Sequence, residues 1–140
     1  MGDFWHENIL IDAHDPTHRV FILDWEVAKR GLPGSDVGIF CGGMNFFIRG
    51  DKVASKPAAV ILQNFIDGYA RCVSDPGDDV GLAQDTLFHW GGYSVFWAPR
   101  SPPGNREVVQ ALVREGVDFM TRSRDIDFLA QSPVQGLVSK

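Results

Sequence analysis

Hydrophobic residues follow two different periods along the chain. The first quarter holds two short apolar runs, NILI at 8–11 and VFIL at 20–23, with a polar, proline-containing stretch between them. Short apolar runs on either side of turn residues are typical of an antiparallel β-hairpin. After Ser35, apolar residues recur every three or four positions, as they do on one face of an α-helix. The pattern predicts a small β-hairpin followed by about four helices.

Capping and helix-breaking residues indicate where these helices begin. Asp36 is a natural N-cap for the first helix, and Pro57 suits the start of the second. The third, residues 80–97, is apolar on more than one side, so we expect it in the middle of the core. A Pro-Pro-Gly break at 102–104 precedes Asn105, which should cap the fourth helix. The expected buried face of the second helix comprises Ile61, Phe65, Ile66, Tyr69 and Val73.

Composition limits the classes of function. With 140 residues, 44% of them hydrophobic, the chain is long enough for one domain with a buried core. The net charge of −5 and the scattered basic residues argue against a nucleic-acid partner. No apolar stretch reaches the ~18 residues of a membrane span, and the first residues do not resemble a signal peptide. We therefore expect no membrane partner and a cytoplasmic location, with Cys41 and Cys72 as buried free thiols.

The candidate chemistry lies around the hairpin. Asp3 and Asn8 have the Asp-x4-Asn spacing of a kinase catalytic loop, and Asp24 ends the second apolar run. In such a loop a carboxylate accepts the proton of the attacking hydroxyl, while an amide oxygen and a second carboxylate bind Mg²⁺. Because a hairpin brings its strand ends together, Asn8 and Asp24 can be close in space although they are distant in sequence.

The ordered series GDFW, NILI, a hairpin, ILDWE and GLPGSDVG resembles the aminoglycoside phosphotransferase and choline kinase-like family. In that family the catalytic loop reads His-Gly-Asp-x4-Asn, and the metal-binding Asp likewise follows a short apolar strand. The resemblance is tight over residues 2–41 and beyond them rests on helices alone. It implies a mostly α fold with a small β-hairpin, namely the helical C-terminal lobe of a protein-kinase-like fold without its N-terminal lobe.

The resemblance also implies a role for each matching residue. Asp3 would be the catalytic base or a carboxylate that orients the substrate, Asn8 and Asp24 would be the metal ligands, and Asp36 would brace the catalytic loop from the start of a helix. The implied reaction is phosphoryl transfer from ATP, with Mg²⁺, to a hydroxyl of a small molecule. Met1 stands where the family has the His of its His-Gly-Asp triplet.

The expected organisation is one C-lobe over residues 1–132, followed by a frayed tail at 133–140. Within it, 1–34 would carry the catalytic loop and metal-binding hairpin, and 35–132 would form a helical subdomain. The family's Gly-rich loop and strand Lys, which hold the phosphates, have no counterpart in this sequence. We therefore expect an N-terminal lobe as a missing partner and an inactive chain by itself. One alternative is a non-catalytic remnant that binds a partner through the surface such a lobe would cover, and another is an unrelated helical domain in which the motif arose by chance.

Simpler interpretations of the same residues stay open. Asp3 fits a frayed terminus, Asn8 a turn, Asp24 a solvated strand end, and Asp36 a helix cap and nothing more. Trp25 is expected to pack beneath the site. The cluster of Trp90, Phe96 and Trp97 fits either a substrate pocket or, preferably, the core. Candidate acceptor-binding residues on the helices are Trp90, Tyr93 and Asp118.

Overall fold

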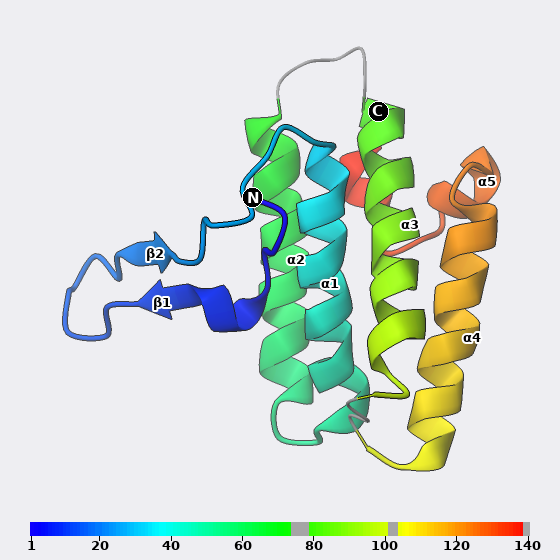
Figure 1. Ribbon diagram of the computed structural model, residues 1–140, viewed down its shortest axis with the longest axis horizontal. Coiled ribbons are helices and arrows are strands. Elements are labelled where there is room, and N and C mark those ends of the chain that lie inside the picture. Colours follow the sequence, from blue (N-terminus) through cyan, green and yellow to red (C-terminus); the bar gives the residue numbers. More distant parts are fainter. Residues whose placement is uncertain (74–78, 101–103, 139–140) are drawn as a thin grey trace.

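The computed structural model describes residues 1–73, 79–100 and 104–138. In these ranges a two-stranded antiparallel hairpin precedes five α-helices (Figure 1). The prediction of a mostly α fold with a small β-hairpin is confirmed. The strands are β1 (Ile9–Ile11) and β2 (Val20–Ile22), and the helices are α1 (Pro33–Gly50), α2 (Ser55–Cys72), α3 (Asp79–Trp97), α4 (Arg106–Arg122) and α5 (Ile126–Leu129). Two 3₁₀ turns, η1 (His6–Asn8) and η2 (Gln135–Leu137), lie at either end.

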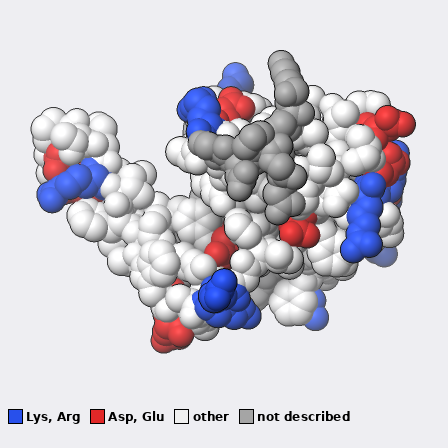
Figure 2. All heavy atoms as spheres, turned by 90° about the horizontal axis from the view of Figure 1, so that it is seen from above, with Lys and Arg blue, Asp and Glu red and all other residues white. Residues whose placement is uncertain are grey.

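The hairpin stands away from the helices as an arm (Figures 1 and 2). Its register pairs Ile9 with Ile22 and Ile11 with Val20. The amide of Leu23 also donates to the Asn8 carbonyl oxygen at 2.9 Å, so the pairing reaches back to the end of η1. Most apolar side chains of both strands are exposed, up to 62% at Ile11. The strands therefore gain little stability from burial.

Helices α1 and α3 form the centre of the fold because glycines let them approach closely. A Cβ atom at Gly34 would lie 2.6 Å from Asp85 Cβ, and one at Gly38 would lie 2.5 Å from the Thr86 carbonyl oxygen. A Cβ atom at Gly42, one turn further on, would lie 2.8 Å from Tyr93 Cδ1. The contacts advance along both helices in the same direction. The two helices are therefore parallel.

The remaining helices complete a core with α3 in its middle, as its apolar pattern predicts. Helix α2 packs on α1, and α4 packs on α3, where the rings of Trp90 and Phe119 are 5.4 Å apart. The expected face of α2 is partly wrong, because Ile61 and Val73 are exposed and Leu62 is buried instead. Fully buried apolar side chains include Ile66, Leu87, Leu112, Leu129 and Val134.

Two expectations about chain segments need correction. Helix α1 begins at Pro33, with Leu32 as its N-cap, so Asp36 lies inside the first turn and is not the cap. Proline at the first turn explains this earlier start, because its φ is already helical. The segment after Pro133 is not frayed over 134–138, since Val134 and Leu137 are buried against α2 and α3.

The expectation about the start of α4 is confirmed, and that about the two cysteines is confirmed for one of them. Asn105 caps α4 as predicted, accepting hydrogen bonds from the amides of Glu107 and Val108 at 3.0 Å. Cys41 is buried as expected, whereas Cys72, at the end of α2, is exposed. The prolines of the 102–104 break lie outside the described residues. Within the described ranges, none of the helices combines the length and hydropathy that a membrane crossing requires.

Candidate functional site

Asp3 and Asn8 are in direct contact. The Asn8 side-chain amide donates to the Asp3 carbonyl oxygen at 2.9 Å and to Asp3 Oδ2 at 3.3 Å. The η1 turn, which ends at Asn8, makes this possible, because the Asn8 backbone amide donates to the Trp5 carbonyl oxygen at 3.1 Å and keeps the segment compact. Both residues are partly buried. Since the amide nitrogen of Asn8 is bound to Asp3, its Oδ1 atom is left to accept or to ligate.

Asp24 follows β2 and is exposed. Its backbone φ is +60°, a left-handed conformation that Asp tolerates better than most residues. The hydrogen bond from Leu23 to Asn8 places the backbone next to Asp24 beside Asn8. In the part of the chain that the structure describes, no hydrogen bond or ion pair joins the Asp24 carboxylate to Asp3 or Asn8. The hairpin thus brings the backbone next to Asp24 beside Asn8, whereas the contact between the Asp3 and Asn8 side chains is local to the η1 turn.

Asp36 reaches back from α1 to the first two residues. Its Oδ1 accepts from the Gly2 amide at 2.7 Å, and its Oδ2 pairs with the Met1 amino group at 2.7 Å. Gly2 adopts φ +101°, and a Cβ atom there would lie 3.0 Å from the Val27 carbonyl oxygen. Only glycine adopts this conformation at low cost. The stretch before Asp3 is therefore held by a carboxylate on one side and by a tight backbone approach on the other.

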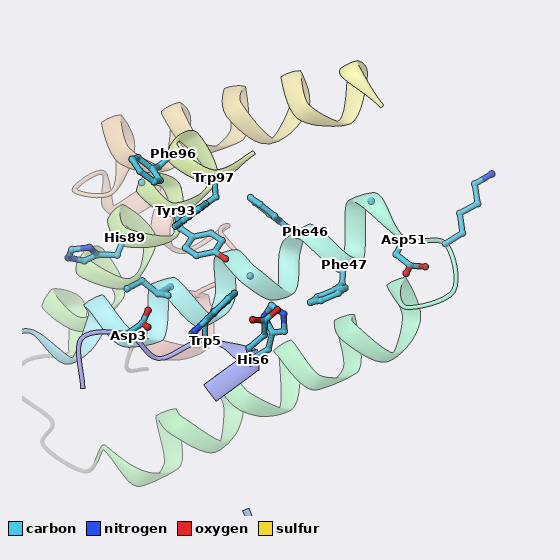
Figure 3. Close-up of a pocket in the computed structure, with 16 residues that line it drawn as sticks. Asp3, Trp5, His6, Phe46, Phe47, Asp51, His89, Tyr93, Phe96 and Trp97 are labelled. Atoms are coloured by element: carbon cyan, nitrogen blue, oxygen red, sulfur yellow. The ribbon is translucent and has the colours of Figure 1, made fainter. Parts of the chain in front are cut away.

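A cavity of about 1040 Å³ opens beside Asp3 (Figure 3). One wall comes from α1, where Ile39, Gly43, Phe46 and Gly50 recur at spacings of three or four and share a face. A second wall comes from α3 through residues between His89 and Trp97. The N-terminal stretch contributes Asp3, Trp5, His6 and Glu7 to the lining. Asp51 lies at the far end from Asp3 (Figure 3), and Lys52 also belongs to the lining.

Aromatic rings and carboxylates dominate this pocket. The Tyr93 ring lies 5.3 Å from Phe46 and 6.3 Å from Trp97, measured between ring centroids. Burial raises the pKa of Tyr93, and the negative charges of Asp3 and Glu7 raise it further. The Tyr93 phenol is therefore uncharged at neutral pH. The lining contains three carboxylates, those of Asp3, Glu7 and Asp51, and a single lysine, so the pocket favours a cation over an anion.

His6 is an uncharged polar group within this wall. Its ring packs edge-on against Phe47 at 4.8 Å and against Trp5 at 5.2 Å. Burial lowers the pKa of His6, although the nearby Glu7 charge opposes the shift. Its Nδ1 atom is buried and has no hydrogen-bond partner within the described residues. A small molecule bound beside Tyr93 and His6 would therefore be next to two uncharged polar side chains.

The described residues hold no group of three or more His, Cys, Asp or Glu side chains able to bind a metal ion. A cation near Asp3 would therefore need an oxygen of another type, and the Asn8 amide supplies one. Carboxylate and amide oxygens are the donors that Mg²⁺ prefers. The residues at this end of the hairpin fit a hard divalent cation by their chemistry.

The pocket was only partly visible in the sequence. Tyr93 lines it as anticipated, but Trp90 is buried in the core, and Asp118 is exposed on α4 outside the lining. Phe96 and Trp97, for which the core was preferred, are 49% and 42% exposed and line the pocket. Trp25 does not pack beneath the site, because it is 58% exposed and its indole nitrogen donates to the Ile22 carbonyl oxygen at 2.8 Å.

The pocket residues on α1 and near η1 were missed. The signal that could have found them is a second stripe on α1, at 39, 43, 46 and 50, which alternates bulky residues with glycines. A second apolar face on a helix needs a second neighbour to cover it. In this fold Tyr93 of α3 packs against Phe46 of that face, and the cavity leaves part of the face open.

The chain is similar to two 4-hydroxytryptamine kinases. It is 30% identical over 122 residues to the kinase of Psilocybe cyanescens, which covers 84% of this chain and 32% of that relative. It is 23% identical over 137 residues to the kinase of Psilocybe cubensis, which covers 82% of this chain and 38% of that relative. No protein-family model matches the chain. No solved structure matches it either.

The chain spans about a third of the length of these relatives. The similarity is distant, but it extends over most of this chain. It relates most of this chain to kinases whose names state a small-molecule substrate.

Proposed function

We propose that this chain forms the catalytic lobe of a small-molecule kinase of the aminoglycoside phosphotransferase and choline kinase-like type. The reaction is transfer of the γ-phosphoryl group of ATP to a hydroxyl of a small acceptor. The observation that carries the proposal is the contact between Asp3 and Asn8 at the mouth of an aromatic, acidic pocket. The similarity to two small-molecule kinases supports the same reaction class.

In this proposal Asp3 accepts the proton of the attacking hydroxyl. Asp3 lines the pocket, where an acceptor would lie, and the Asn8 amide restrains its carboxylate. A general base must lie within hydrogen-bond reach of the proton that it removes. The arrangement supports this role because the acceptor cavity begins at the carboxylate itself.

Asn8 and Asp24 are the proposed metal ligands. The Asn8 Oδ1 atom is left to accept, and the Asp24 carboxylate is exposed at the end of β2, one residue beyond the backbone contact with Asn8. When bound, Mg²⁺ would neutralise the charge that develops on the phosphate oxygens. The left-handed backbone at Asp24 supports a functional role, because unusual backbone conformations gather at such sites.

Asp36 is the proposed brace of the catalytic loop. Its two oxygens hold the first two residues, and Asp3 comes directly after them. Positioning is a large part of what catalyses phosphoryl transfer, so a carboxylate that fixes the approach to Asp3 would act on the rate without touching the acceptor. An N-terminal lobe, which would supply most contacts to the nucleotide, remains the proposed partner of this lobe.

The acceptor proposed for the pocket is a hydroxyl-bearing organic cation. The lining contains three carboxylates and one lysine, and the surfaces of its aromatic rings also attract cations. The relatives are named as kinases of 4-hydroxytryptamine, an amine that carries both a hydroxyl and an aromatic ring. The pocket of this chain suits an acceptor of that kind.

The test is titration calorimetry of the chain with Mg·ATP. We expect saturable binding that Asp24→Ala weakens on the order of tenfold or more, because it removes a charged ligand. Asp118→Ala, an exposed carboxylate on α4, is the matched control and should leave the affinity unchanged. Equal affinity in the Asp24 and Asp118 variants, or no binding at all, would contradict the proposal.

A non-catalytic binding module is the second candidate, favoured by one specific observation. The hairpin exposes Leu10, Ile11 and Val20 by more than half of their surface, and Phe21 by 46%. Exposed apolar clusters of this kind mark surfaces that another protein segment covers. The calorimetry separates the two candidates, because a binding module of this kind needs no metal–nucleotide complex.

A further inference from the structure

Two groups of helical glycines differ in what surrounds them, and Gly68 on α2, outside the pocket, belongs to neither. In the first group a side chain would collide with a neighbouring helix. A Cβ atom at Gly38 would lie 2.5 Å from the Thr86 carbonyl oxygen, and one at Gly91 would overlap the Gly116 carbonyl oxygen. Close packing between helices therefore accounts for these glycines.

The second group faces the pocket, and packing does not account for it. A Cβ atom at Gly92 would have no heavy atom within 4 Å. At Gly43 the nearest atoms would be His6 Nδ1 at 3.5 Å and the Tyr93 hydroxyl oxygen at 3.8 Å, which are ordinary contacts. Glycine is among the least favourable residues inside a helix, so a glycine in open space lowers stability without any packing gain. What the missing side chain provides at Gly92 is room in the cavity.

The space that the missing side chain of Gly92 leaves in the cavity, here called the gap at Gly92, has aromatic neighbours. His89 and Phe96 lie three residues before and four after it, so they share its face of α3 on either side. Tyr93, the next residue, also lines the cavity. A gap between aromatic side chains on a helix surface suits a flat ring, which can stack or pack edge-on against them.

We propose that Gly92 is a specificity-determining residue, whose missing side chain admits the aromatic ring of a planar, positively charged acceptor. The inference rests on the proposed function for the identity of the site, and it adds the position that distinguishes a ring-bearing acceptor from one without a ring. The acidic lining attracts the cation, and the gap at Gly92 selects its shape. A side chain at this position fills the space that the ring needs.

The test compares variants of the whole chain by titration calorimetry with two hydroxyl-bearing cations, 4-hydroxytryptamine and choline. The first has an aromatic ring and the second has none. We expect Gly92→Leu to weaken the binding of 4-hydroxytryptamine roughly tenfold or more, because it overpacks the subsite. Choline affinity should change far less. Gly92→Ala is the milder variant, and it should weaken 4-hydroxytryptamine binding in the same direction.

Two further glycine variants control for effects on the fold. Gly68 on α2 lies outside the pocket, and a Cβ atom there would meet only Arg71 Nη2, at 3.8 Å. Gly68→Ala and Gly92→Ala should both raise the melting temperature, because alanine favours the helix. Only the Gly92 variant should lose ligand affinity. Gly91→Ala should instead lower the melting temperature, because it forces α3 away from α4.

The inference is wrong if Gly92→Leu, folded as judged by its melting curve, binds 4-hydroxytryptamine as tightly as the parent chain does. It is also wrong if the parent chain does not bind 4-hydroxytryptamine, or if choline affinity falls equally. Each of these results leaves the proposed function standing as long as the parent chain binds Mg·ATP. Loss of Mg·ATP binding in the parent chain would instead count against the proposed function itself.

Discussion

Gly2 is the residue at which the backbone before Asp3 is most constrained. Its φ of +101° and the Val27 carbonyl oxygen, 3.0 Å from where a Cβ would lie, both exclude a side chain. We expect Gly2→Ala to lower the free energy of unfolding by about 1 kcal/mol in urea denaturation. The matched variant is Gly31→Ala, where a Cβ atom would touch nothing within 4 Å and φ is not positive. That variant should be neutral or slightly stabilising, and equal effects of the two would show that Gly2 is not constrained.

Tyr93 offers a direct measure of the charge around Asp3. The chain has two tyrosines, so Tyr69→Phe leaves Tyr93 as the sole tyrosinate signal in an alkaline absorbance titration. We expect Tyr93 to ionise above the ordinary tyrosine pKa, because of burial and the Asp3 and Glu7 charges. Asp3→Asn removes one negative charge and should lower the pKa of Tyr93. Asp118→Asn should leave it unchanged.

The same shift affects stability at high pH. A tyrosine whose pKa rises on folding contributes stability that is fully present below its unfolded pKa of about 10, and loses it as the pH rises through its folded pKa. Part of the alkaline loss of stability should therefore disappear in Tyr93→Phe. If Asp3→Asn left the pKa of Tyr93 where it was, the Asp3 carboxylate would not face the pocket.

Between elements, one polar clamp joins α1 to α4. Asn45 is nearly completely buried, and its amide donates to Glu115 Oε2 at 2.8 Å, while Arg49 pairs with Glu115 Oε1 at 2.5 Å. Glu115→Ala leaves the Asn45 amide without a partner and should cost about 1–3 kcal/mol of unfolding free energy. Glu115→Gln keeps an acceptor for Asn45 and loses only the exposed pairing, so its cost should stay below about 1 kcal/mol. Equal costs would show that the buried hydrogen bond does not matter.

The elements themselves were largely predictable from the sequence, because each has a local signal. Alternating turn and apolar residues mark the hairpin, and Asn105 marks the start of α4. The start of α1 was missed because both Pro33 and Asp36 are residues typical of a helix start. The helix begins at Pro33. The buried end of the chain was missed because Val134 precedes and Leu137 ends a short 3₁₀ turn, which has no clear hydrophobic period.

The pocket was less predictable than the elements around it. It depends on α1 and α3 lying parallel and close, which the glycines at 34, 38 and 42 permit. A sequence shows that a helix has a second apolar stripe. Whether another helix covers that stripe depends on how the whole fold is assembled. The contact between Asp3 and Asn8 could be inferred from the sequence because their spacing is local. The neighbours of Asp24 are harder to infer, because the hairpin brings Asp24 near residues that are distant from it in sequence.

At the scale of the whole molecule, the hairpin arm and the helical body differ in how they are held. The arm is joined by three residue pairs and exposes most of its apolar side chains, whereas the body buries a continuous core. Hydrogen exchange followed by mass spectrometry should find the amides of 9–22 exchanging orders of magnitude faster than those of α3. Equal protection of the two regions would mean that the arm is covered in solution.

The central claim is that residues 3, 8 and 24 surround a divalent cation at the base of the hairpin. Titration with Mn²⁺ in the presence of ADP, followed by amide NMR, measures this directly, because a paramagnetic ion broadens the signals nearest to it. The account predicts that the amides of Asp3, Asn8 and Asp24 broaden first and that Asp24→Ala abolishes the effect. Broadening centred on another acidic group, such as Asp12 and Asp15 in the hairpin loop, would contradict it.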